Sequence, residues 1–183
     1  MSILVDFFDE ISSKSEYFKH LKRTVTIGMY GSFKGDNITI LENFRDFLAS
    51  EGYRARMSLD PGYPGVALSE VSQHQKNCLA STKLRKSSRI HIIFFIEGPQ
   101  EHNVNLSAAM ELQALAGHEV RDVLLLFEKG LKKEDITSYF AGTVETHEGR
   151  WEWDEFARDT DLHLIRGRQF CLNRMRRYST GFK

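Results

Sequence analysis

The hydrophobic positions of this chain follow helical spacing in some segments and a strand-like pattern in others, and the two kinds of segment alternate. Apolar or alternating runs predict five strands, over residues 24–30, 53–59, 89–96, 122–127 and 143–146. Apolar residues at helical spacing predict helices, over residues 3–22, 37–50, 66–86, 104–116, 132–139 and 161–178. Strands that alternate with helices form βαβ units, so this pattern predicts a parallel sheet.

The segment 89–96 (RIHIIFFI) is the most apolar of the chain, which is typical of a central parallel strand covered on both faces. Five strands of this kind predict an α/β fold, a flavodoxin-like three-layer sandwich with the parallel sheet in the order 2-1-3-4-5. We expect a single domain over residues 1–183. It would comprise an N-terminal helix over 1–23, the sheet core over 24–147 and a C-terminal helical extension over 148–183.

Typical capping residues flank the helix predicted over 37–50. Asn37 stands where an N-cap side chain would accept a hydrogen bond from the first turn. Gly52 follows the last apolar position, as a glycine that ends a helix does.

The composition restricts the class of protein. With 183 residues, 41% of them hydrophobic and 27% charged, the chain can bury a substantial core. Lys+Arg and Asp+Glu both number 25, so the net charge gives no reason to expect nucleic acid or a membrane as a partner. No apolar run reaches the roughly 18 residues that a bilayer requires. Residues 1–10 do not resemble a signal peptide, and we therefore expect a cytoplasmic protein.

Several ligand-binding motifs are absent. The sequence has no GxxxxGK[ST] phosphate loop, no GxGxxG after the first strand and no GxSxG elbow. Cys78 and Cys171 lie far apart and lack metal-ligand or redox spacing, which favours reduced thiols. We therefore expect neither a metal ion nor a resident cofactor.

In a sheet of this order, ligands bind beyond the carboxyl ends of the strands, where the strand order reverses. Tyr30, Gly31, Ser32 and Phe33 follow the first strand. A glycine lets a ligand approach the backbone, and the N-terminus of the next helix offers free N–H groups to a phosphate or a sugar hydroxyl. The same residues also fit an ordinary turn between a strand and a helix.

Two carboxylates stand near the same predicted crevice. Asp60 ends the second strand, where it would orient a ribose hydroxyl or transfer a proton, or would simply cap the loop. Glu111 lies four residues after Ser107 on one helix face, among apolar neighbours. A lone carboxylate there is costly without a partner or a function, although glutamate is also a good helix former at a solvent edge. Gly98 and Asn105 complete the predicted ligand-binding residues.

Four pieces of sequence combine into a family resemblance: YGSF at 30–33, Asp60, EGP at 97–99 and SAAMEL at 107–112. Over residues 24–128 they resemble nucleoside deoxyribosyltransferases and their N-glycoside hydrolase relatives. The glutamate on the same helix is also similar to that of Toll/interleukin-receptor-like (TIR-like) domains that cleave NAD at its nicotinamide bond.

The resemblance implies a role for each matching residue. Glu111 would be the nucleophile that attacks the anomeric carbon, and Asp60 the assisting carboxylate. Tyr30, Gly31 and Phe33 would form the loop that binds the base or the sugar. Members of the family often complete their sites across a dimer, so the resemblance also implies a homodimer or other homo-oligomer.

The leading hypothesis is a hydrolase or transferase that acts on the N-glycosidic bond of a nucleoside, a nucleotide or NAD. A non-catalytic nucleotide sensor or protein-interaction adaptor of the same fold is the alternative. A third hypothesis is flavin mononucleotide binding through residues 31–37, by analogy with flavodoxin.

The C-terminal part of the chain is less informative. Trp151 and Trp153 lie in the charged segment EGRWEWDEF, and we expect them to pack in the core or on the surface, with a lid or a subunit contact as the alternative. The C-terminal helix is basic, and we expect a solvated face rather than a phosphate or nucleic-acid contact; its arginines are Arg166, Arg168, Arg174, Arg176 and Arg177.

Overall fold

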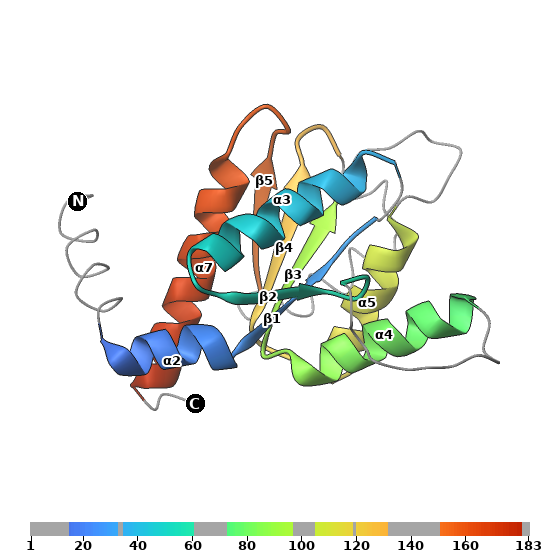
Figure 1. Cartoon of the computed structure of the whole chain (residues 1–183). Helices are drawn as coiled ribbons and strands as arrows, with labels where there is room; N and C mark the ends of the chain where they lie inside the picture. Colours follow the sequence, from blue (N-terminus) through green and yellow to red (C-terminus); the bar gives the residue numbers. More distant parts are fainter. Residues whose placement is uncertain are drawn as a thin grey trace.

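The computed structural model describes residues 15–32, 35–60, 73–96, 105–118, 120–131 and 151–180. Five strands form one parallel sheet in the order β2-β1-β3-β4-β5 (Figure 1). The predicted flavodoxin-like α/β fold is therefore confirmed, including the strand order. The strands are β1 (Thr26–Tyr30), β2 (Arg54–Met57), β3 (Ile90–Phe95), β4 (Val123–Glu128) and β5 (Glu152–Phe156).

Helices cover both faces of the sheet and make three layers (Figure 1). They are α2 (Glu16–Thr24), α3 (Asn37–Ser50), α4 (Gln73–Ser87), α5 (Leu106–Ala116) and α7 (Leu162–Ser179). Successive residues of the central strand β3 alternate between the two cores, as the pleat requires. Ile92 and Phe94 face the core made with α2, α3 and α7, whereas Ile93 and Phe95 face the core made with α4 and α5. All six residues of β3 are buried, which confirms the central strand.

The fifth strand lies elsewhere than predicted. β5 is Glu152–Phe156, so the sheet extends past residue 147, and the boundary between a sheet core over 24–147 and a purely helical extension over 148–183 is wrong. The predicted strand over 143–146 lies outside the described residues. Two of the acidic residues of β5 pair with arginines of α7.

Some predicted helices extend beyond the described residues. The N-terminal helix predicted over 3–22 is not one continuous helix: α2 begins only at Glu16, because Ser15 has an extended backbone and its hydroxyl accepts a capping hydrogen bond from the N–H of Phe18 at 3.1 Å. The described part of the helix predicted over 66–86 is α4, and residues 132–139 lie outside the described residues. None of the helices in the described ranges has the length and apolar character that a membrane span needs.

The start of α3 differs from the capping prediction. Asn37 is the first helical residue, not the N-cap, and the preceding Asp36 makes no capping hydrogen bond. The Asn37 side chain is buried instead, and its Oδ1 accepts a hydrogen bond from Arg158 Nη2 at 3.2 Å. The predicted role of Gly52 is confirmed: its φ of +85° is a conformation that glycine adopts without strain, directly after the helix.

The basic face of α7 is partly an internal surface, which corrects the expectation of a solvated face. Arg166 Nη2 lies 2.7 Å from Glu152 and its Nε 3.0 Å from Asp154, both on β5. The side chain of Arg174 is only 5% exposed and binds Glu152 at 2.9 Å and Asp122 at 3.2 Å. These ion pairs attach α7 to the edge strand. The acidic residues of β5 and the arginines of α7 therefore neutralise one another's charge.

The two tryptophans have different surroundings. Trp151 is buried in the core beside α5, and its Nε1 donates a hydrogen bond to the carbonyl of Val120 at 2.7 Å. Packing in the core, as expected for a large aromatic side chain, is confirmed for this residue. Trp153 remains 48% exposed on the edge strand β5, with its ring edge-to-face against Phe127.

Gly167 sets how closely α7 approaches α3, and we predict that Gly167→Ala destabilises the protein. An added Cβ would lie 2.1 Å from Cζ of Phe44, a ring that is fully buried and packed edge-to-face on Phe94 at 5.1 Å. Alanine gains about 1 kcal/mol of helix propensity, but overpacking costs about 1–3 kcal/mol. We therefore expect a net loss of up to about 2 kcal/mol in urea denaturation.

Gly117→Ala is the matched control for this substitution. Gly117 follows α5 with a φ of −64°, and the nearest atom to an added Cβ is 3.7 Å away. We expect this variant to be as stable as the wild type or slightly more stable. Equal stability losses for the two variants would show that α7 does not approach α3 at Gly167.

Candidate functional site

The carboxyl ends of β1 and β3 meet the first turn of α5, at the point where the strand order reverses. Ser107 Oγ donates a hydrogen bond to the carbonyl of Gly31 at 3.3 Å, which joins the end of β1 to α5. Asn105 binds the backbone of Ile96 through both ends of its amide, at 2.9 and 3.0 Å, and so closes the end of β3. Four of the predicted residues thus lie together, since buried Ser32 directly follows Gly31.

Phe33 and Gly98, the other two predicted residues of these loops, lie outside the described residues. Gly31 itself has a structural reason to be glycine. A Cβ at this position would lie 3.1 Å from Leu41 and 3.3 Å from Phe94, so the backbone packs closely against the core on the α3 side.

Tyr30 lies in the core rather than at the crevice. Its ring extends back along the sheet face under α4 and α5, where 2% of the residue is exposed. The hydroxyl forms a hydrogen bond with Nδ1 of His91 at 3.2 Å, and the two rings are stacked. Gly28 leaves space for that hydroxyl, because a Cβ there would lie 2.5 Å from Tyr30 Oη. The predicted contact of Tyr30 with a ligand therefore has no support in the position of this side chain.

His91 is a polar residue that the sequence did not identify. It is the second residue of β3, and 2% of it is exposed. Burial, with a smaller contribution from the charge of Arg85, lowers the pKa of His91 to about 4. The imidazole is therefore neutral at neutral pH and belongs to the interior beneath α4 and α5.

Glu111 has partners on the neighbouring helix. Its Oε2 accepts a hydrogen bond from Arg85 Nη1 at 2.7 Å, and its Oε1 accepts one from Ser81 Oγ. The side chains of Glu111 and Arg85 are 15% and 17% exposed, so the salt bridge is largely shielded but open to solvent at one side. We expected a carboxylate among apolar neighbours to have a partner, and that partner is Arg85. In the sequence, Arg85 is only one of several basic residues on a polar helix.

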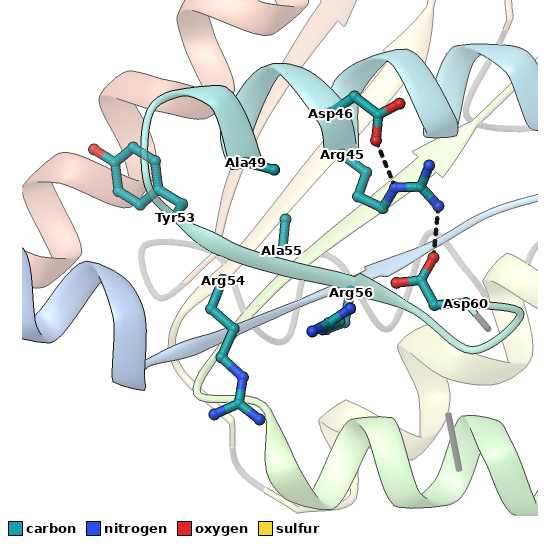
Figure 2. A pocket seen from close by; sticks show the side chains of 8 residues that line it. All are labelled: Arg45, Asp46, Ala49, Tyr53, Arg54, Ala55, Arg56 and Asp60. Carbon is teal, nitrogen blue, oxygen red and sulfur yellow. Dashed lines mark hydrogen bonds and ion pairs between the residues drawn. The ribbon is translucent and has the colours of Figure 1, made fainter. Parts of the chain in front are cut away.

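Asp60 also has two hydrogen-bond partners, and Figure 2 shows one of them, Arg45. Its Oδ1 accepts a hydrogen bond from Arg45 Nη1 at 2.6 Å, and its Oδ2 accepts one from the backbone N–H of Met57 at 2.9 Å. Arg45 also binds Asp46 at 2.8 Å. The hydrogen bond to Asp46, with a further contribution from Asp60, raises the pKa of the Arg45 guanidinium. Asp60 therefore lies across the end of β2, where it accepts the hydrogen bond of the Met57 N–H at the edge of the sheet.

The two candidate carboxylates do not form a pair. Asp60 binds a residue of α3, on the face of the sheet covered by α2, α3 and α7. Glu111 binds residues of α4, on the opposite face. Among the described residues no hydrogen bond or ion pair connects the two, so the arrangement favours one working carboxylate rather than two.

A second polar cluster at the carboxyl edge was not predicted. Glu128, the last residue of β4, is 7% exposed and accepts hydrogen bonds from Nε of Arg158 and, at 3.0 Å, from its Nη2. Arg158 follows β5 and also binds Asn37 at the start of α3. An acid that ends an otherwise apolar strand is the only signal in the sequence. The 41% exposed Arg158 side chain places a fixed guanidinium beside the strand ends.

Within the described ranges, no group of three or more His, Cys, Asp or Glu side chains is arranged to hold a metal ion. The site therefore consists of backbone groups at the end of β1, amide and hydroxyl side chains of α5, and the salt bridge of Glu111. No protein-family model matches the sequence, and no curated protein matches it either.

Proposed function

We propose that the protein cleaves the N-glycosidic bond of a nucleoside, a nucleotide or NAD, by hydrolysis or by transfer, with Glu111 as the attacking carboxylate. The observation that carries this proposal is the position of Glu111. It lies one helical turn after Ser107, which binds the carbonyl of Gly31 at the point where the strand order reverses. The carboxylate is shielded, paired with Arg85 and still partly open to solvent.

The chemistry needs a fixed anion with a free lone pair. Each oxygen of Glu111 accepts one hydrogen bond from α4, and a carboxylate oxygen has two acceptor sites. An oxygen of Glu111 would attack the anomeric carbon while the bond to the base breaks, and the base would leave with the electron pair. A purine or pyrimidine would then take up a proton from water, whereas nicotinamide would leave NAD as a neutral molecule without one. Water or a second base would then attack the glycosyl ester and release Glu111.

Asp60 takes no part in this proposal. Its side chain is only 3% exposed, and its partner Arg45 is on the other face of the sheet from Glu111. Arg158 is a residue that could bind an anionic group of a nucleotide, because its guanidinium lies at the carboxyl ends of β4 and β5.

The family resemblance also leads us to propose a homo-oligomer, which analytical ultracentrifugation tests independently.

Glu111→Gln is expected to lower the rate of base release at least about 100-fold, because an amide of the same shape cannot act as the nucleophile. The measurement is the initial rate of release of the free base, or of nicotinamide from NAD. Glu42→Gln is the matched control, since it makes the same change on α3, on the opposite face of the sheet. Full activity of Glu111→Gln would refute this role for Glu111.

A second candidate function is a non-catalytic nucleotide sensor or adaptor. The observation that favours it is that Ser81 and Arg85 bind both oxygens of Glu111, which also suits a purely structural connection between α4 and α5. Calorimetric titration separates the two candidates. A nucleotide that binds tightly and is recovered intact supports the sensor, whereas a bound nucleotide that loses its base supports the enzyme.

A further inference from the structure

A groove follows the open edge of the sheet, between α3 and the edge strand β2 (Figure 2). It encloses about 380 Å³. The lining combines residues from the last two turns of α3 with residues of β2 and its ends; they are Arg45, Asp46, Ala49, Tyr53, Arg54, Ala55, Arg56 and Asp60. Two alanines leave room in it, one from each element.

Among the described residues, no strand pairs with β2 on the side away from β1, and the backbone of one residue of β2 can take a new partner there. The N–H of Tyr53 donates to the carbonyl of Leu48 at 3.0 Å, and the N–H of Met57 donates to Asp60 at 2.9 Å. Both donors point away from β1, and backbone groups of alternate residues point to the same side of a strand. Ala55, which lies between them, therefore presents its N–H and its carbonyl to the open edge.

Two positive charges flank this open position. Arg54 and Arg56 are exposed, whereas Ala55 and Met57 are buried toward α3, so the two arginines project from the other side of the strand. Side chains two residues apart on a strand lie about 7 Å from one another. Within the described part of the chain, neither arginine has a hydrogen-bond or ion-pair partner. Both acids of the groove bind Arg45 instead.

We propose that this edge binds an extended segment of another protein. The segment would contain two acidic residues separated by one residue of any type. The middle residue would exchange two backbone hydrogen bonds with Ala55, as in other cases of strand addition to a sheet edge. Its side chain would enter the groove beside Ala49. The two acids would then face Arg54 and Arg56, because residues two apart in both strands have the same spacing.

The charges argue against a second copy of the chain as the occupant. Two β2 edges that paired with one another would place arginines opposite arginines, and like charges in directly opposed positions destabilise a strand pair. On an edge strand, such charges also prevent unspecific pairing. The proposal goes beyond the chemistry of Glu111, and its test does not depend on that chemistry.

The test is an NMR titration of the ¹⁵N-labelled protein with the blocked peptide Thr-Glu-Val-Glu-Thr. We expect saturable shifts of the amides from Tyr53 to Met57. Single Arg54→Gln and Arg56→Gln substitutions should each weaken binding about 2- to 5-fold, the usual range for an exposed charge pair. The double variant should weaken it about 4- to 25-fold. Arg121→Gln, which removes another exposed arginine, should leave the affinity unchanged.

Two further peptides decide whether the segment pairs as a strand. Thr-Lys-Val-Lys-Thr should not bind, and the acidic peptide with an N-methyl group on its valine should lose binding, because it cannot donate to the carbonyl of Ala55. Equal binding of the methylated peptide would overturn strand pairing. Absence of shifts in β2, equal affinity of the arginine variants, or concentration-dependent shifts without any peptide would overturn the proposal as a whole.

Discussion

Phe94→Ala is expected to lower the free energy of unfolding by about 3–5 kcal/mol, the usual cost of removing a fully buried phenylalanine ring. Phe94 belongs to the central strand β3 and has no exposed surface. Its ring packs edge-to-face on Phe44 of α3 at 5.1 Å and on Phe156 of β5 at 5.8 Å. Because these neighbours belong to two different elements, they cannot both move to fill the cavity.

Urea denaturation of Phe94→Ala and of Leu162→Ala provides the comparison. Leu162 is 64% exposed at the start of α7, so its truncation should change stability by no more than about 0.5 kcal/mol. A loss for Phe94→Ala as small as that for Leu162→Ala would mean that the core between β3 and α3 is not packed as described.

Acid is expected to destabilise the protein through His91 by about 3 kcal/mol between pH 7 and pH 4. Burial lowers the pKa of His91 to about 4 from its ordinary value of 6.5. Above pH 6.5 the imidazole is neutral in both the folded and the unfolded chain, so the full stability is present. As the pH falls from 6.5 to 4, the unfolded chain binds a proton that the folded chain excludes, and the stability is lost.

The measurement compares the pH dependence of the unfolding free energy for the wild type and for His91→Phe. Other acid-titrating groups are common to both proteins, so the difference between the two slopes reports His91. We expect the wild type to lose more stability than the variant over this interval. In the wild type, NMR should show a His91 ring that is still neutral at pH 5. A ring that titrates near pH 6.5 would contradict the burial of His91 against Tyr30.

Most of the fold was predictable because the strands β1, β3 and β4 are apolar runs with buried residues throughout. Such runs are read correctly from local pattern alone, and their alternation with helices determines a parallel sheet. The strand order follows the general behaviour of such sheets. β5 was missed because only one of its five residues is buried and three are acidic. In the structure β5 pairs with β4 and binds arginines of α7, and local pattern carries no information on such distant partners.

The candidate site was predictable only in part for the same reason. The sequence correctly indicated that Asn105, Ser107 and Gly31 lie together, because all three flank the switch point of the sheet. It also indicated that Glu111 needs a partner, but the partner is Arg85, 26 residues earlier, on a helix with no distinctive pattern.

The buried polar groups were the least predictable part of the structure. Asn37 and Asp60 have side chains that suit caps and turns, and local pattern cannot show that one instead binds Arg158 and the other Arg45. Tyr30 ends an apolar strand next to a loop, so the sequence assigned it to the crevice. Its hydroxyl reaches the interior only because Gly28, two residues earlier on the same face, has no side chain.

The proposed cleavage of an N-glycosidic bond can be measured directly. The purified wild-type protein is incubated with a panel of nucleosides, nucleotides and NAD, and the products are separated by reversed-phase chromatography. We expect free base or nicotinamide from at least one member of the panel, with the matching sugar or sugar phosphate. Complete recovery of every compound, from a protein shown by NMR to be folded, would contradict it.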